Sequence, residues 1–118
     1  MAKILIIDDE QMTLDMLAIF VEMSGHESLK AIDSRQGWSI LDYETPEAVL
    51  LDIQLPDTNG LLMCKELKQN EKFANLPIIM ISAHFPPLIA EAEEAGADDY
   101  LAKPINIKTL RSMLEEYI

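Results

Sequence analysis

The segment Ile4–Glu10 reads ILIIDDE, and its pattern recurs along the chain. Its four apolar residues, three of them β-branched, are too few for a helix and typical of a strand buried on both faces. Three acidic residues follow at once. They end the apolar run long before it could form a signal peptide or a membrane span. The segment therefore predicts a buried strand with charged groups directly after its carboxyl end.

The rest of the chain alternates between short apolar runs and amphipathic stretches. Further strands are predicted at 28–32, 48–51, 78–81 and 99–102. Helices are predicted at 11–24, 34–43, 61–73, 87–95 and 107–118, the last capped by Asn106 and burying Ile107 among its apolar residues. Continuous apolar strands alternating with helices predict an α/β fold of the (βα)5 type, with a parallel sheet covered on both faces.

Composition limits the possible classes of protein. A chain of 118 residues, 49% apolar and 25% charged, predicts one globular domain over residues 1–118. Cys64 is the only cysteine; it excludes an internal disulfide, fits a reducing cytoplasm and is expected to be buried. The net charge of −12 argues against direct binding of nucleic acid, whose phosphates need Lys and Arg. It suits a protein that binds cations or basic partner surfaces.

Polar residues with chemical potential follow four of the predicted strands. Asp8 and Asp9 follow the first, Asp52 the third, Ser82 the fourth and Lys103 the fifth. Because parallel strands end at one edge of the sheet, these side chains are expected to meet in one cleft. Two unit charges ~4 Å apart repel by about 4 kcal/mol at an effective dielectric of 20. The acids therefore require either a proton or a cation, and oxygen ligands favour a hard ion such as Mg²⁺.

Asp52 is the candidate nucleophile, since an aspartate carboxylate can form an acyl phosphate. Lys103 could place a positive charge on phosphoryl oxygens, and the Ser82 hydroxyl could donate a hydrogen bond to another. Pro104 biases the preceding lysine towards an extended conformation and permits a cis bond. Each residue alone has an ordinary explanation, because acids after strands often cap the next helix. Their combination in this order is what is specific.

With these residues placed, the chain resembles the receiver domains of two-component response regulators over essentially its whole length. The motifs that carry the resemblance are ILIIDDE (4–10), LLDIQLPDTNG (50–60), IMISA (79–83), AGADDY (95–100) and Lys103-Pro104. The resemblance implies a flavodoxin-like, doubly wound sheet with strand order 2-1-3-4-5. It also implies a signalling switch that catalyses only its own phosphorylation and dephosphorylation.

The resemblance assigns chemical roles to five positions. Asp52 would accept a phosphoryl group from a sensor histidine kinase or a histidine phosphotransfer protein, and Lys103 would pair with that group. A Mg²⁺ (or Mn²⁺) ion would be bound directly by Asp9 and Asp52, by the backbone carbonyl of Gln54, and by Asp8 mainly through water. None of these residue types is replaced in this sequence, which argues for a working phosphoacceptor site.

The resemblance also implies a switch. The Ser82 hydroxyl would move towards the phosphoryl group and the Tyr100 ring would turn with it. The face formed by the fourth helix, fifth strand and fifth helix would then change its affinity for a downstream protein target or an output domain. Gln54 and His84 match variable positions that tune how fast the phosphoryl group is lost. Without the resemblance, Tyr100 would be interpreted as a core aromatic and His84 as an exposed loop residue.

Three departures from the family pattern affect details only. Ile105 stands where an aromatic residue is common, and Leu55 where methionine is frequent. The run Phe85-Pro86-Pro87 predicts an unusually stiff loop after the fourth strand, at a place that must move in the family's switch.

Three other functions are alternatives to that of a receiver domain. A phosphohydrolase with an aspartate nucleophile needs a second acid two residues later, where Gln54 stands, and a capping insertion that no loop is long enough to supply. A flavin or nucleotide carrier needs a phosphate-binding loop after the first strand, where residues 8–10 are acidic. A pure interaction module stays open, as does the choice between a stand-alone regulator and the front of a longer one.

Overall fold

The computed structural model describes all of residues 1–118. The strands are β1 (Lys3–Ile7), β2 (Glu27–Ala31), β3 (Ala48–Asp52), β4 (Ile78–Ser82) and β5 (Asp99–Ala102). The helices are α1 (Gln11–Met23), α2 (Ser34–Leu41), α3 (Gly60–Gln69), α4 (Ile89–Glu94) and α5 (Ile107–Tyr117). Strand and helix alternate throughout, as the sequence predicts.

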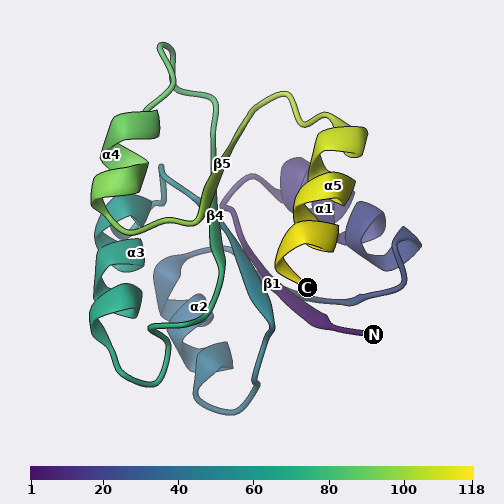
Figure 1. The fold of residues 1–118 in the computed structure, drawn as a ribbon, viewed down its shortest axis with the longest axis horizontal. Helices are drawn as coiled ribbons and strands as arrows, with labels where there is room; N and C mark the ends of the chain where they lie inside the picture. The colour runs from purple at the N-terminus through teal and green to yellow at the C-terminus, as the bar shows by residue number, and fades with distance from the viewer.

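The five strands form one parallel sheet with the order β2-β1-β3-β4-β5. In Figure 1, α1 and α5 cover one face of the sheet, and α2, α3 and α4 cover the other. The predicted doubly wound (βα)5 fold and its strand order are therefore confirmed. β2 is added on one side of β1, and β3 is added on its other side, so the order of the strands changes direction between β1 and β3. Such folds bind ligands at the carboxyl ends of the two strands at this point.

The core consists of two layers because successive residues of a strand point to opposite faces of the sheet. Ile4 and Ile6 of β1 belong to the layer under α1 and α5, whereas Leu5 and Ile7 belong to the layer under α2, α3 and α4. All four side chains are fully buried. A strand enclosed on both sides has no solvent face, which explains why its sequence shows an unbroken apolar run.

Three helices begin at a residue whose side chain accepts a hydrogen bond from an N–H of the first turn. These caps are Asp33 for α2, Asn59 for α3 and Asn106 for α5. The predicted Asn106 cap of α5 is therefore confirmed. At the other end of α1, Gly25 adopts φ +91°, a left-handed conformation that glycine tolerates without strain.

Two helices are shorter than predicted by three residues, and the others by one or two. α3 ends at Gln69 rather than near Phe73, because the Asn70 side chain accepts the Lys72 N–H at 2.9 Å and draws the backbone into a turn. α4 begins at Ile89, with Leu88 as its N-cap, two residues after the second proline.

Ile107 was expected in the core, but it is 45% exposed. It is the first residue of α5, where the helix has not yet reached the sheet. Leu110 and Leu114, one and two turns further on, provide the buried contacts. The apolar spacing of α5 was therefore correctly interpreted except at its first position.

Gly60 should be intolerant of any side chain. It is the first residue of α3, its N–H donates to the carbonyl of Ile53 at 2.6 Å, and an added Cβ would collide with the carbonyl oxygen of Asp52. We expect Gly60→Ala to lower the free energy of unfolding by about 1–3 kcal/mol, as overpacking usually does. Leu62→Ala removes an exposed side chain from the same helix and should change it by less than about 0.5 kcal/mol. Urea denaturation of both variants measures the free energy of unfolding. Equal decreases in the two variants would contradict the prediction.

Candidate functional site

A cleft of about 590 Å³ lies at the carboxyl edge of the sheet. Most of its lining residues come directly after β1, β3, β4 and β5, which is where the sequence predicts the chemistry. The lining consists of Asp9, Glu10, Thr13, Met16, Asp52, Gln54, Ala83, Lys103, Pro104 and Ile105.

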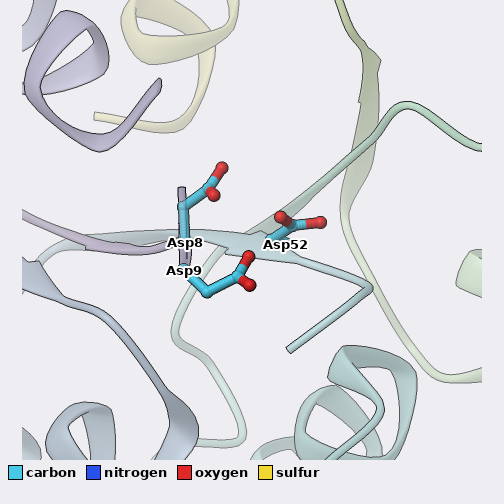
Figure 2. Close-up of side chains that lie close together, drawn as sticks. All are labelled: Asp8, Asp9 and Asp52. Atoms are coloured by element: carbon cyan, nitrogen blue, oxygen red, sulfur yellow. The ribbon is translucent and has the colours of Figure 1, made fainter. Parts of the chain in front are cut away.

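Three carboxylates meet beside this cleft. Figure 2 shows Asp8 and Asp9, which follow β1, next to Asp52 at the end of β3. One oxygen from each residue lies within 4.8 Å of the others. Asp8 is fully buried and Asp52 is only 4% exposed, whereas Asp9 is exposed. The expected convergence of the acids is therefore present, with two of the three charges largely removed from solvent.

Lys103 is the cation that faces these acids. Its ammonium lies 3.0 Å from Asp8 Oδ2 and 3.0 Å from Asp52 Oδ2. The Lys103–Pro104 bond is cis, the isomer that the sequence permits. One positive charge thus balances only part of the charge of the three carboxylates.

Burial and charge together shift the protonation of the cluster. Burial first, and then repulsion from the Asp8 carboxylate, raise the pKa of Asp52 to about 6, and the hydrogen bond and charge of Lys103 oppose this shift only in part. Burial by itself would favour a neutral Lys103 amine, but hydrogen bonds and charge attraction to Asp8 and Asp52 outweigh it and raise the lysine pKa. The site therefore holds a strongly cationic lysine and excess negative charge.

The two adjacent acids differ in their surroundings. Asp8 Oδ1 accepts the Glu10 N–H at 2.9 Å, and its other oxygen faces Lys103. Asp9 lines the open cleft instead. Asp52 Oδ1 accepts the Gln54 N–H at 3.2 Å. Asp9 is thus the acid of the pair with more freedom to bind a ligand from the cleft.

These residues fit a divalent metal ion. The available donors are carboxylate and carbonyl oxygens, which hard cations such as Mg²⁺ prefer. The raised pKa of Asp52, caused first by burial and then by repulsion from Asp8, shows that Lys103 alone does not provide enough positive charge for this carboxylate. A divalent cation next to Asp9 and Asp52 would supply it.

The remaining predicted residues lie around the cleft. Ser82 is buried at the end of β4, and its hydroxyl accepts the His84 N–H at 3.0 Å. The exposed His84 ring is held at 2.9 Å from the carbonyl of Pro86 and does not line the cleft. Gln54 does line it. Tyr100, half-buried on β5, accepts the Leu88 N–H at 3.1 Å through its hydroxyl.

Sequence reasoning missed part of the cleft wall. Glu10, Thr13 and Met16 line it from the start of α1, and the Thr13 hydroxyl donates to the Glu10 carboxylate. Their spacing of three residues places them on one side of the helix. That spacing was visible in the sequence, but the apolar pattern of α1 directed attention to its core face.

Comparison with known proteins gives a consistent picture. The model of the response regulator receiver domain family matches residues 4–115. The phosphate regulon transcriptional regulatory protein PhoB of Pseudomonas aeruginosa is 36% identical over 113 residues, which cover 95% of this chain and 49% of PhoB. The chain spans about half the length of this and several other curated relatives that it matches.

Solved structures agree with the sequence comparison. A CheY-like response regulator receiver domain protein of Methanospirillum hungatei is 28% identical, with a TM-score of 0.89 over 98% of this chain and 92% of that one. The receiver domain of sensor histidine kinase PA1611 of P. aeruginosa, with a magnesium ion coordinated in its active site cleft, is 25% identical. Its TM-score is 0.89 over 98% of this chain and 96% of that one. The chain belongs to the family of response regulator receiver domains.

Proposed function

We propose that residues 1–118 form one receiver domain and that Asp52 is its phosphoacceptor. The observation that supports this assignment is the position of Asp52, which is buried at the end of β3, is paired with Lys103 and lies next to the acid pair Asp8–Asp9. It is the only one of the three acids that is paired with the lysine, lines the cleft and ends a central strand.

The proposed reaction is a phosphoryl transfer from a phosphohistidine. A carboxylate oxygen of Asp52 attacks the phosphorus, the phosphorus–nitrogen bond breaks, and the imidazole leaves with the electron pair. Lys103 shifts from the carboxylate towards a phosphoryl oxygen, and the Ser82 hydroxyl donates to another. Mg²⁺ or Mn²⁺ held by Asp9, Asp52 and the Gln54 carbonyl, with Asp8 acting mainly through water, would neutralise charge on the transferring group. The magnesium ion coordinated in the active site cleft of the PA1611 receiver supports metal binding in this cleft.

The same groups would also take part in the hydrolysis that removes the phosphoryl group. Water attacks the phosphorus of the acyl phosphate, and Asp52 is released as a carboxylate. We propose that Gln54, which lines the cleft, and His84, which lies just beyond it, set how easily water approaches. The domain would thus catalyse its own modification and its hydrolysis, and act on no separate substrate.

Switching would proceed through the loop between β4 and α4. Ser82 binds the start of this loop at the His84 N–H, and Tyr100 binds its end at the Leu88 N–H. Movement of the Ser82 hydroxyl towards a phosphoryl group would remove the first contact, which would allow the loop and Tyr100 to move. The affected surface is the α4–β5–α5 face, where a protein target or output domain would bind.

An apolar stripe on α1 supports a proteinaceous phosphodonor. Met12, Ile19 and Met23 share one side of the helix and are 83%, 54% and 72% exposed. Met16 lies on the same helix and lines the cleft, so the stripe runs alongside the site. We propose that a helix of the sensor histidine kinase or histidine phosphotransfer protein packs here.

Three further points concern nucleic acid, membranes and location in the cell. The charge of −12 gives no reason to expect direct nucleic-acid binding by this domain. No helix of the protein is long and apolar enough to cross a bilayer. A cytoplasmic location stays a prediction of the sequence.

Phosphorylation should depend on Asp52 and on metal. Incubation with acetyl phosphate and Mg²⁺ is expected to add one phosphoryl group to the wild-type protein, and none with chelator or in Asp52→Asn, which lacks the nucleophile. Intact mass measures the adduct. Asp42→Asn, which alters an exposed acid at the end of α2, should behave as wild type. Absence of an adduct under every condition would favour the interaction-module alternative.

Metal and pH should change stability through Asp52. A carboxyl whose folded-state pKa is raised from 3.8 to about 6 loses stability as pH rises through that window, because the unfolded chain releases its proton first. Above pH 6 in chelator, Asp52→Asn should therefore exceed wild type by about 1–2 kcal/mol after allowance for solvent screening. The difference should vanish towards pH 4, and Mg²⁺ should stabilise wild type more than the variant. Urea denaturation followed by fluorescence measures it; a pH-independent difference would contradict the prediction.

The α1 stripe should matter only for a protein donor. Met12→Ser/Ile19→Ser is expected to slow transfer from an autophosphorylated histidine kinase about tenfold, the effect of losing roughly 1.4 kcal/mol of interface contacts. Labelling by acetyl phosphate should not change. Tyr43→Ser alters an equally exposed apolar side chain after α2 and serves as the control. Equal slowing with both donors would place the defect in the site rather than in docking.

A further inference from the structure

Asp57 lies in the loop between β3 and α3 but binds a different helix. Its Oδ1 accepts the Ser34 N–H at 3.1 Å, and its Oδ2 accepts the Ser34 hydroxyl at 2.7 Å and the Arg35 N–H at 3.1 Å. These N–H groups belong to the first turn of α2 and have no partner within their own helix. The hydrogen bonds, that of the Ser34 hydroxyl first, lower the pKa of the Asp57 carboxyl.

The loop that carries Asp57 is closed at its base. Gln54 and Asn59 pair in an isolated antiparallel bridge, and the Gly60 N–H donates to the Ile53 carbonyl at 2.6 Å. Asn59 in turn caps α3. The base is therefore fixed to β3 and α3, and the tip at Asp57 is fixed to α2.

The base of this loop includes a proposed ligand position. The Gln54 N–H donates to Asp52 Oδ1 at 3.2 Å, so the peptide of Gln54 is in direct contact with the phosphoacceptor. The chain from Gln54 to Asp57 is four residues long and contains Pro56, whose fixed φ limits its freedom. A displacement of the tip is therefore transmitted to Gln54 with little room for local adjustment.

We propose that Asp57 is a positioning residue: its hydrogen bonds to the first turn of α2 hold the β3–α3 loop so that the Gln54 carbonyl is oriented for metal binding. The inference rests on the metal site of the proposed function. α2 is a suitable anchor because Gly37 and Leu41 are buried against the sheet-side core. Asp57 would thus act on the metal only through Gln54.

Asp33 provides a matched control on the same helix. Its side chain caps α2 by accepting the Gln36 N–H at 2.8 Å, but it makes no hydrogen bond to the β3–α3 loop. Asp33→Ala and Asp57→Ala each remove one negative charge and one carboxylate from the α2 N-terminus. Only Asp57→Ala releases the loop.

The first test is Mg²⁺ titration by calorimetry. Asp57→Ala is expected to raise the Mg²⁺ dissociation constant about tenfold, as loss of an outer partner of a metal ligand commonly does. Ser34→Ala, which removes the shortest bond and keeps the Asp57 charge, should raise it about threefold. Asp33→Ala should leave it within about twofold of wild type. Equal weakening in the Asp33 and Asp57 variants would overturn the proposal, because charge or helix capping would then explain both.

The second test uses the metal-free protein. Amide hydrogen exchange at Gly60, whose N–H closes the loop, should become faster in Asp57→Ala and remain as in wild type in Asp33→Ala. Unchanged exchange in Asp57→Ala would overturn the positioning role without reference to metal. Wild-type protein that binds no Mg²⁺ would refute the proposed metal site itself. Wild-type binding with an unchanged Asp57→Ala affinity would refute only this inference.

Discussion

Repulsion among three carboxylates at the carboxyl edge of the sheet is the constraint on which the rest of the molecule depends. Folding brings Asp8, Asp9 and Asp52 together, and only Lys103 opposes them directly. The fold tolerates this because two continuous core layers hold β1 and β3 in place from both faces. Apolar burial is non-directional and large, so it can support a locally unfavourable arrangement of charge. The resulting site is poised to gain stability from any added positive charge.

The loops that follow the strands are the segments that would move when the charge of the site changes. Each is tied at specific points: Ser82 and Tyr100 contact the two ends of the β4–α4 loop, and the loop after β3 is bonded at its base and its tip. Few apolar contacts secure these segments compared with the strands they follow, which is typical of regions that rearrange at modest energetic cost. The buried strands thus fix the positions of the site residues, whereas the loops, each held by a few hydrogen bonds, are the segments that would move.

The sequence was sufficient for the fold and the acid cluster because both depend on periodicity. Buried parallel strands need unbroken apolar runs, and the residue after each run must lie at one edge, so Asp52 and Lys103 could be placed without coordinates. Features that depend on side-chain geometry could not be foreseen. The turn at Asn70 and the contact of Asp57 with α2 depend on particular side-chain hydrogen bonds, and the exposure of Ile107 depends on how α5 packs on the core. The roles of Gln54, His84 and Tyr100 came from resemblance and stay proposals.

The alternation along β1 has a consequence beyond the core. Ile6 and Ile7 point to opposite layers, and the same two-residue rhythm continues past the strand, where Asp8 is enclosed and Asp9 faces the cleft. The alternation of side chains along β1 therefore determines that Asp8 is buried and that Asp9 is exposed to the cleft. Shifting the register of the whole of β1 by one residue would invert that alternation, exchange the two hydrophobic layers and swap the environments of the two acids together. The different environments of Asp8 and Asp9 thus depend on the same alternation of side chains that forms the two core layers.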